Sequence, residues 1–289
     1  MFRGSIVALV TPMNEDGSID FESYLNLLEI HVKNSSDGVV IVGTTGEAPT
    51  IDFEEHVKLI EQGVKFINGR IPVIAGTGAN STKEAIYLSA KAKELGADAC
   101  LLVTPYYNRP NQQGLYQHFK AINDAVSLPQ ILYNVPCRTG CDLLNETVIN
   151  LSLLNNIVGI KDATGDINRI KTLKTKVDDD FLLISGDDNT FLDFIENGGH
   201  GVISVTANVV PNLMHNICHK MFDGDFAQAK SLNNKIIELH KLMFVEPNPI
   251  PVKWALSYLK IIKQNIRLPL VGLDQRYHQK MIECLKNVI

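Results

Sequence analysis

Cysteine is scarce in this sequence, and its spacing argues against two kinds of small, cross-linked protein. The 289 residues contain five cysteines, at positions 100, 137, 141, 218 and 284. The count is odd and no CxxC pair occurs, which does not fit a disulfide framework or a zinc ribbon. Cys137 and Cys141 could share a metal with a distant histidine, but Arg138 between them opposes cation binding. We therefore expect reduced thiols and no metal site.

Long runs of one charge or of apolar residues are also missing. The net charge is −5, and lysines and arginines are interspersed with acids, so no basic surface for nucleic acid is evident. The first apolar segment stops at Thr11-Pro12, too short for a membrane span and without a convincing cleavage site. With 45% hydrophobic residues the chain can bury a large core. We expect a cytoplasmic protein that acts on a small molecule, with no nucleic-acid or membrane partner.

Eight short apolar runs recur along the chain, separated by stretches long enough for helices. Such alternation favours parallel strands joined by helical crossovers, and eight strands are the number that closes a barrel. An open doubly wound sheet is the alternative. The runs are Ile6 to Val10, Val39 to Val42, Val73 to Ala75, Ala99 to Val103, Gln130 to Tyr133, Val158 to Lys161, Leu182 to Ser185 and Val202 to Val205.

The intervening segments carry signals of helix starts. Asp52 with Glu55 and Ser81 with Glu84 both fit capping boxes, and Pro211 suits a first helical turn. After about residue 224 the strand runs stop, and three helices are predicted, at 226–244, 250–262 and 275–288. The sequence therefore predicts an α/β fold, a (β/α)8 TIM barrel over residues 1–224, with a small all-helical domain over 225–289.

Lys161 ends the sixth apolar run and stands where a strand meets a loop. Partial desolvation there favours the neutral amine, which can form an imine with a carbonyl compound. The simpler interpretation is an ammonium that keeps its head in water and pairs with Asp162. Taken alone, the residue favours this ion pair.

Polar residues follow five further strands at the end where barrel enzymes carry their active sites. They are the segments 43–47, 104–108, 133–140, 185–188 and 204–206. The glycines and threonines of 43–47 lack the spacing of a nucleotide loop, so hydroxyls and amides facing a carboxylate are favoured. Tyr107 and Tyr133 suit either the rim of the site or proton transfer. Arg138 suits either a surface charge or a fork that binds a carboxylate.

These loops together resemble the lysine-dependent pyruvate aldolase family, and most closely its branch that joins pyruvate to aspartate 4-semialdehyde. The similarity runs nearly end to end. It rests on GTTGE at 43–47, TPYYNRP at 104–110, YNVPCRTG at 133–140, GIKDATGD at 159–166, SGDD at 185–188, GGHGVISVTAN at 198–208 and EPNPIPVKWAL at 246–256.

The resemblance implies roles for four catalytic residues. Lys161 would form a Schiff base with pyruvate, and Tyr133 would position and protonate the intermediate. Thr44 and Tyr107 would complete a hydroxyl relay, with Tyr107 contributed across a dimer interface. The enzyme would be a lyase that needs neither a metal nor an organic cofactor.

The resemblance also implies a substrate site. Arg138 would bind the carboxylate of L-aspartate 4-semialdehyde, while Thr45, Gly186 and Ile203 would surround pyruvate. Two departures from the family pattern are mild: Cys137 stands where small residues are usual, and Asp162 replaces a common glutamate. The implied assembly is a homotetramer, a dimer of dimers.

Feedback inhibition by L-lysine is a further implication of the family. The matching residues are Ala48, Pro49, His56, Asn80, Glu84 and Tyr106. Phe53 departs from the histidine of strongly lysine-sensitive members.

Two other functions remain open from sequence. One is a sister lyase, such as N-acetylneuraminate lyase or a keto-sugar-acid aldolase, against which Arg138 and the Tyr106-Tyr107 pair argue. The other is a barrel that binds a ligand without catalysis, since a fold does not guarantee an activity.

Overall fold

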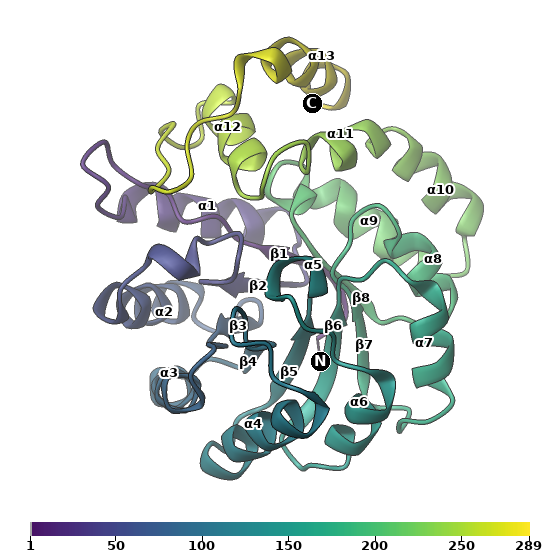
Figure 1. Cartoon of the computed structure of the whole chain (residues 1–289). Coiled ribbons are helices and arrows are strands. Elements are labelled where there is room, and N and C mark those ends of the chain that lie inside the picture. The colour runs from purple at the N-terminus through teal and green to yellow at the C-terminus, as the bar shows by residue number, and fades with distance from the viewer. Residues whose placement is uncertain (1) are drawn as a thin grey trace.

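The chain forms a closed barrel of eight parallel strands, drawn in Figure 1 from a computed structural model that describes residues 2–289. Each of the eight predicted apolar runs overlaps an observed strand, and their ends differ by at most two residues. The (β/α)8 prediction is thus confirmed, and the open sheet is excluded. The strands are Gly4–Ala8 (β1), Gly38–Ile41 (β2), Val73–Gly76 (β3), Ala99–Val103 (β4), Gln130–Asn134 (β5), Ile157–Asp162 (β6), Leu182–Ser185 (β7) and Gly201–Ser204 (β8).

Along each strand, the side chains alternate between the inside of the barrel and the surrounding helices. In β5, Ile131 and Tyr133 belong to the cluster inside the barrel, whereas Leu132 belongs to the cluster between strands and helices. Successive strand side chains point to opposite faces, so this alternation follows from the pleat. Tyr133 is the last inward residue of its strand and therefore reaches the carboxyl-terminal mouth of the barrel.

Helices surround the barrel and alternate with its strands (Figure 1). Their apolar faces bury against the outward strand residues in one continuous core. They are Phe21–Lys33 (α1), Phe53–Ile67 (α2), Thr82–Leu95 (α3), Gln112–Ala125 (α4), Pro136–Thr139 (α5), Asn145–Ser152 (α6), Ile167–Lys174 (α7), Phe191–Glu196 (α8) and Pro211–Phe222 (α9), with short 3-10 turns at Ala48–Thr50 (η1) and Thr206–Asn208 (η2).

The predicted helix starts are confirmed in part. Asp52 accepts from the Glu55 amide at 2.8 Å, and the Glu55 carboxylate returns to the Asp52 amide, which completes the capping box of α2. Ser81 accepts from the Glu84 amide, but Glu84 does not complete the box, because its side chain faces a cavity instead. The second capping box was therefore wrong in its second half.

The C-terminal region is helical, as predicted, but its elements are shorter. It contains Phe226–Asn234 (α10), Ile237–Leu242 (α11), Ile250–Tyr258 (α12), the turn Gln275–Tyr277 (η3) and His278–Val288 (α13). The helix predicted at 226–244 breaks at Ile236, which is fully buried and has φ −118° and ψ 5°. The helix predicted at 250–262 stops early, since Lys260 has φ 60° and cannot continue it.

Two of the C-terminal helices contact elements of the barrel region. Helix α10 contacts α9, and α12 contacts η2. The division of the chain into two domains at residue 224 stays a prediction.

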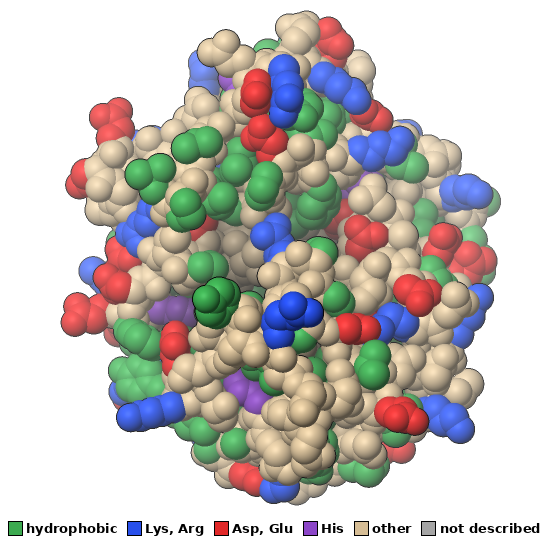
Figure 2. Space-filling model, in the orientation of Figure 1, with side chains coloured by type: hydrophobic (Ala, Val, Ile, Leu, Met, Phe, Trp, Pro, Cys, Tyr) green, Lys and Arg blue, Asp and Glu red, His purple; other side chains and the backbone are tan. Residues whose placement is uncertain are grey.

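Figure 2 shows acidic and basic side chains interspersed over one face of the molecule, in keeping with the mixed charges of the sequence. None of the helices in residues 2–289 combines the length and apolar character that a membrane crossing requires.

Candidate active site

Lys161 and Tyr133 lie side by side at the carboxyl-terminal end of the barrel. They are register partners on the neighbouring strands β6 and β5, so their side chains point to the same side. The Lys161 Nζ lies 4.2 Å from the centroid of the Tyr133 ring. The amine is thereby held over an aromatic face.

Burial changes the acid–base behaviour of Lys161. Only 6% of the residue is exposed. This burial lowers the pKa of its amine to about 7; Asp188 opposes the shift with its negative charge, and Arg138 adds to it with its positive charge. A large share of the amine is therefore unprotonated near neutral pH, which a nucleophilic lysine requires.

The simple ion pair between Lys161 and Asp162 does not form. Asp162 points the other way along the pleat, and its carboxylate accepts from Arg169 Nε at 3.1 Å and from the Thr164 amide at 2.9 Å. Consecutive strand residues face opposite sides, which separates the two charges. The interpretation that Lys161 alone favoured is therefore wrong.

Asp188 is a buried carboxylate near Lys161 that the sequence analysis did not single out. Its Oδ2 accepts from the Val205 amide and from the amide and hydroxyl of Thr206. Its Oδ1 has no hydrogen-bond partner within residues 2–289. The SGDD motif after β7 was the available signal, but nothing in it indicated which of its two aspartates is buried.

Thr44 lies with Tyr133 at this mouth. Burial raises the pKa of the Tyr133 hydroxyl, while the positive charge of Arg138 and a hydrogen bond with the Thr44 side chain lower it. Two of the four predicted catalytic residues thus join Lys161 within one chain.

Two predicted site residues do not line the cavity that opens at Lys161. Tyr107 is 90% exposed and has φ 72°, on a loop that carries its ring outside the cavity. Ile203 is buried in the barrel core, among the residues packed inside the strands. The cavity wall that one chain forms around Lys161 therefore includes neither side chain.

A cavity of about 200 Å³ opens at Lys161. Gly186 forms part of its wall, and a Cβ at this position would lie 2.9 Å from Lys161 Cε and 2.8 Å from Ala163 Cβ. The glycine is therefore needed for space beside the amine. The polar and functional residues of the wall include Thr44, Thr45, Tyr133, Cys137, Arg138, Lys161, Gly186, Asp187 and Asn248.

Arg138 lies at the exposed entrance, on the short helix α5 that Pro136 begins. Its Nη2 donates to the Asn248 carbonyl at 3.2 Å, and the Asn248 side chain donates to the Thr45 hydroxyl at 2.9 Å. The remaining guanidinium donors can bind an anion. Asn248 is a second residue that the sequence analysis did not single out, although it belongs to the EPNPIPVKWAL motif.

A buried ion pair connects the active-site loop to the C-terminal helices. Lys253 of α12 pairs with Glu47, which ends the GTTGE segment, and also donates to the Thr11 carbonyl at 3.0 Å. The second Glu47 oxygen accepts from the Arg267 amide at 3.0 Å. Sequence reasoning did not find this pair, because its members are more than 200 residues apart.

A larger cavity of about 410 Å³ shares a wall with the first, formed by Thr44, Tyr133 and Arg138. It is lined by most of the residues predicted to bind lysine: Ala48, Pro49, His56, Glu84 and Tyr106, together with Phe53. Asn80 adjoins it and donates to the Tyr106 carbonyl at 3.2 Å. The predicted set is therefore brought together in space.

A buried lysine amine with a lowered pKa at the carboxyl end of a (β/α)8 barrel, with a tyrosine and an arginine on the same cavity wall, defines a class I, Schiff-base lyase. A model of the dihydrodipicolinate synthetase family matches residues 1–288. The chain belongs to this family.

Individual relatives agree over nearly the whole length. The 4-hydroxy-tetrahydrodipicolinate synthase of Nitrosospira multiformis is 56% identical over 98% of this chain and 94% of its own. That of Coxiella burnetii is 55% identical over 100% and 99%. The crystal structure of the chloride-inhibited dihydrodipicolinate synthase from Acinetobacter baumannii, complexed with pyruvate, is 52% identical, with a TM-score of 0.98 over 100% of this chain and 99% of that one.

Proposed function

We propose that the cavity at Lys161 condenses pyruvate with L-aspartate 4-semialdehyde to give 4-hydroxy-tetrahydrodipicolinate, the entry step of the diaminopimelate and lysine pathway. The observation that carries the proposal is the buried Lys161 amine, with a pKa of about 7, over the Tyr133 ring. The pyruvate complex of the Acinetobacter baumannii relative supports the choice of the first substrate.

The reaction begins with addition of the neutral Lys161 Nζ to the ketone carbon of pyruvate. Loss of water then gives a protonated imine, which withdraws electrons from the adjacent methyl carbon. That carbon loses a proton and becomes an enamine, which attacks the aldehyde carbon of the semialdehyde. The amino group of the second substrate finally adds to the imine carbon and displaces Lys161, closing the ring.

Proton transfer in these steps is assigned to Tyr133, Thr44 and Tyr107. Imine formation and hydrolysis each move several protons, and hydroxyl groups in hydrogen-bond contact can pass them on. Contact between Tyr133 and Thr44 supports the first part of this relay. Tyr107 would come from a second copy of the chain, in keeping with its 90% exposure here.

Substrate binding is assigned to the loops around Lys161. Arg138 would hold the carboxylate of the semialdehyde, and Thr45 and Gly186 would contact pyruvate. Support comes from their positions on the cavity wall. Ile203 would act from below, as part of the apolar floor of the barrel.

Steady-state kinetics with competing acceptors test the proposal. We expect turnover of pyruvate with aspartate 4-semialdehyde and little with N-acetylmannosamine or sugar-derived aldehydes. Lys161→Ala should lower kcat by several orders of magnitude, whereas Lys174→Ala, at a partly exposed lysine absent from the cavity wall, should leave it unchanged. A preference for the sugar acceptors would instead indicate a sister lyase.

L-Lysine is proposed as an inhibitor that binds the larger cavity. Glu84 would pair with its ammonium groups, and His56 and Tyr106 would complete the site, as their places on the cavity wall support. The dihydrodipicolinate synthase from Cyanidioschyzon merolae, solved with lysine bound, is 36% identical over 99% of this chain, with a TM-score of 0.97. Phe53 in place of a histidine weakens the site, so we expect inhibition only at high lysine. Turnover unaffected by lysine would remove this part of the proposal.

The active assembly is proposed to be a cytoplasmic homotetramer, built as a dimer of dimers. The dimer is supported by the exposed Tyr107, which the relay needs from a second copy. The tetramer rests on the family resemblance. Light scattering coupled to size-exclusion chromatography measures the assembly size directly.

A further inference from the structure

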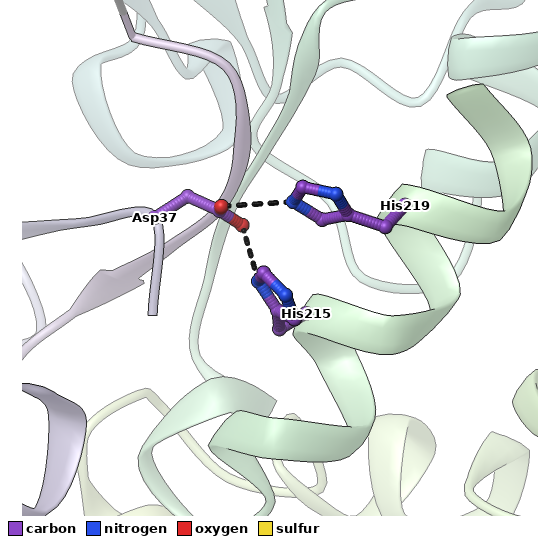
Figure 3. Close-up of side chains that lie close together, drawn as sticks. All are labelled: Asp37, His215 and His219. Atoms are coloured by element: carbon purple, nitrogen blue, oxygen red, sulfur yellow. Dashed lines mark hydrogen bonds and ion pairs between the residues drawn. The ribbon is translucent and has the colours of Figure 1, made fainter. Parts of the chain in front are cut away.

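Asp37, His215 and His219 form a cluster (Figure 3). It lies at the end of the barrel opposite the active site, since Asp37 stands at the amino-terminal end of a strand. Asp37 immediately precedes β2, whereas both histidines lie on α9. The proposed reaction takes place at the carboxyl-terminal mouth and does not use this cluster.

The two imidazoles converge on one carboxylate. His219 Nε2 lies 2.9 Å from Asp37 Oδ1, and His215 Nδ1 lies 3.1 Å from Oδ2. The histidines are four residues apart, so one turn of helix places their rings together, with centroids 4.0 Å apart. All three ligand atoms lie within 4.8 Å of one another.

The carboxylate is fixed by the backbone of β1. The Ser5 amide donates to Asp37 Oδ2 at 2.8 Å. Gly4, with φ 102°, lets this strand approach closely, since a Cβ there would lie 2.3 Å from the same oxygen. Such supporting hydrogen bonds orient metal ligands in known sites.

We propose that Asp37, His215 and His219 bind a divalent transition-metal ion of the zinc type, with solvent completing its coordination. Two imidazoles and one carboxylate are a ligand set that zinc sites use, at about 2.0–2.2 Å from the ion. His219 has 48% of its side chain exposed, which gives solvent access to the ion.

Metal binding requires that each ring nitrogen facing the carboxylate lose its proton. In a neutral imidazole the proton moves to the other ring nitrogen, and in an imidazolium it is released to solvent. The ion therefore replaces the two hydrogen bonds to Asp37.

The residues next to the cluster are a cysteine and two cationic side chains that contact other groups. Cys218 lies between the histidines in sequence, but it is fully buried in the core between strands and helices and does not belong to the cluster. Arg3 stacks on Phe222, whose ring contacts His219, and Lys220 pairs with Asp225. Imidazole ligands favour copper, zinc, nickel and cobalt over magnesium and calcium.

The ion would join the start of β2 and the backbone of β1 to α9. Its effect would thus fall on stability and not on turnover, because the site lies at the opposite end of the barrel from Lys161.

Calorimetric titration of the tag-free, chelator-treated enzyme with Zn²⁺ tests the proposal. We expect one ion per chain, and a Tm increase of about 5 °C at a free Zn²⁺ concentration one hundred times Kd. Mg²⁺ should do neither. His215→Gln and His219→Gln should each weaken binding at least about tenfold. His278→Gln is the matched control, since this partly buried histidine lies outside the cluster and hydrogen-bonds the Leu273 carbonyl.

Normal turnover of pyruvate and aspartate semialdehyde shows that each variant is folded. Absence of Zn²⁺ binding by the parent enzyme would overturn the proposal, as would binding that His215→Gln and His219→Gln leave unchanged. A lower Tm in these variants without any Zn²⁺ binding would identify the cluster as a hydrogen-bonded contact only, and the metal site would be wrong.

Discussion

Lys161 and Lys253 are both buried lysines, and their surroundings give them different chemistry. Burial lowers the pKa of both amines. Lys253 pairs with Glu47, whose negative charge opposes this lowering. Lys161 pairs with no carboxylate in residues 2–289 and lies over the Tyr133 ring. The absence of a paired carboxylate, and not burial alone, therefore distinguishes the nucleophilic lysine from the structural one.

The rate of imine formation should reflect the pKa of Lys161. Below pH 7 the amine is protonated, so the rate should fall about tenfold per pH unit. Above about pH 7, where the folded amine is neutral, it should level off. Rapid mixing with pyruvate, followed by borohydride quenching at each pH, measures this rate. A rate that keeps rising to pH 10 would show an ordinary, solvated lysine.

Arg138→Ala should impair use of the second substrate. Loss of the guanidinium fork should raise KM for aspartate semialdehyde about 10- to 100-fold, while formation of the pyruvate adduct continues. Steady-state kinetics with each substrate varied separates the two effects.

Arg138→Lys is the control for charge. It keeps the cation but loses the fork, so its KM should lie between those of the parent and Arg138→Ala. Unchanged semialdehyde kinetics in Arg138→Ala would contradict the assigned role.

At the scale of elements, the strands and the site residues at their carboxyl ends could be predicted from the sequence. The eight runs could be located because buried parallel strands are continuously apolar, and the polar residues after them mark the mouth of the barrel. Lys161, Tyr133, Thr44 and Arg138 were found in this way. Asp188 and Asn248 were not, because a loop's sequence does not indicate which polar side chain turns inward. The helix break at Ile236 also depends on tertiary packing, which local propensity does not contain.

The Glu47–Lys253 pair should be important for the placement of the GTTGE loop. Lys253→Met leaves Glu47 buried without its partner, which should cost about 3–5 kcal/mol of unfolding free energy. Activity should fall as well, since Glu47 belongs to the same loop as Thr44. Urea denaturation and turnover measure the two effects.

Two variants serve as controls for this pair. Glu47→Gln combined with Lys253→Met should recover part of the lost stability, because no charge is then buried alone. Lys174→Met removes an exposed pair with Asp179 and should change stability by less than about 1 kcal/mol. Equal losses in Lys174→Met and Lys253→Met would refute the special role of burial.

At the scale of the whole molecule, one chain lacks part of the proposed relay. Lys161, Tyr133 and Thr44 line one cavity, whereas Tyr107 is 90% exposed and does not line it. If a second copy supplies Tyr107, each active site combines residues of two chains.

Mixed assemblies test this arrangement. Lys161→Ala and Tyr107→Phe should each be strongly impaired alone. When the two are refolded together, half of the dimers carry one intact site, so about a quarter of the parent activity should return. No recovery on mixing would show that Tyr107 acts within its own chain or not at all.

Reductive trapping of the pyruvate imine tests the central claim most directly. The enzyme is incubated with pyruvate, reduced with borohydride and digested, and the modified residue is located by mass spectrometry. We predict one pyruvate-derived adduct per chain, on Lys161, with none on the other buried lysine, Lys253, and none in Lys161→Ala. An adduct elsewhere, or no adduct at all, would contradict the assignment of Lys161 as the nucleophile.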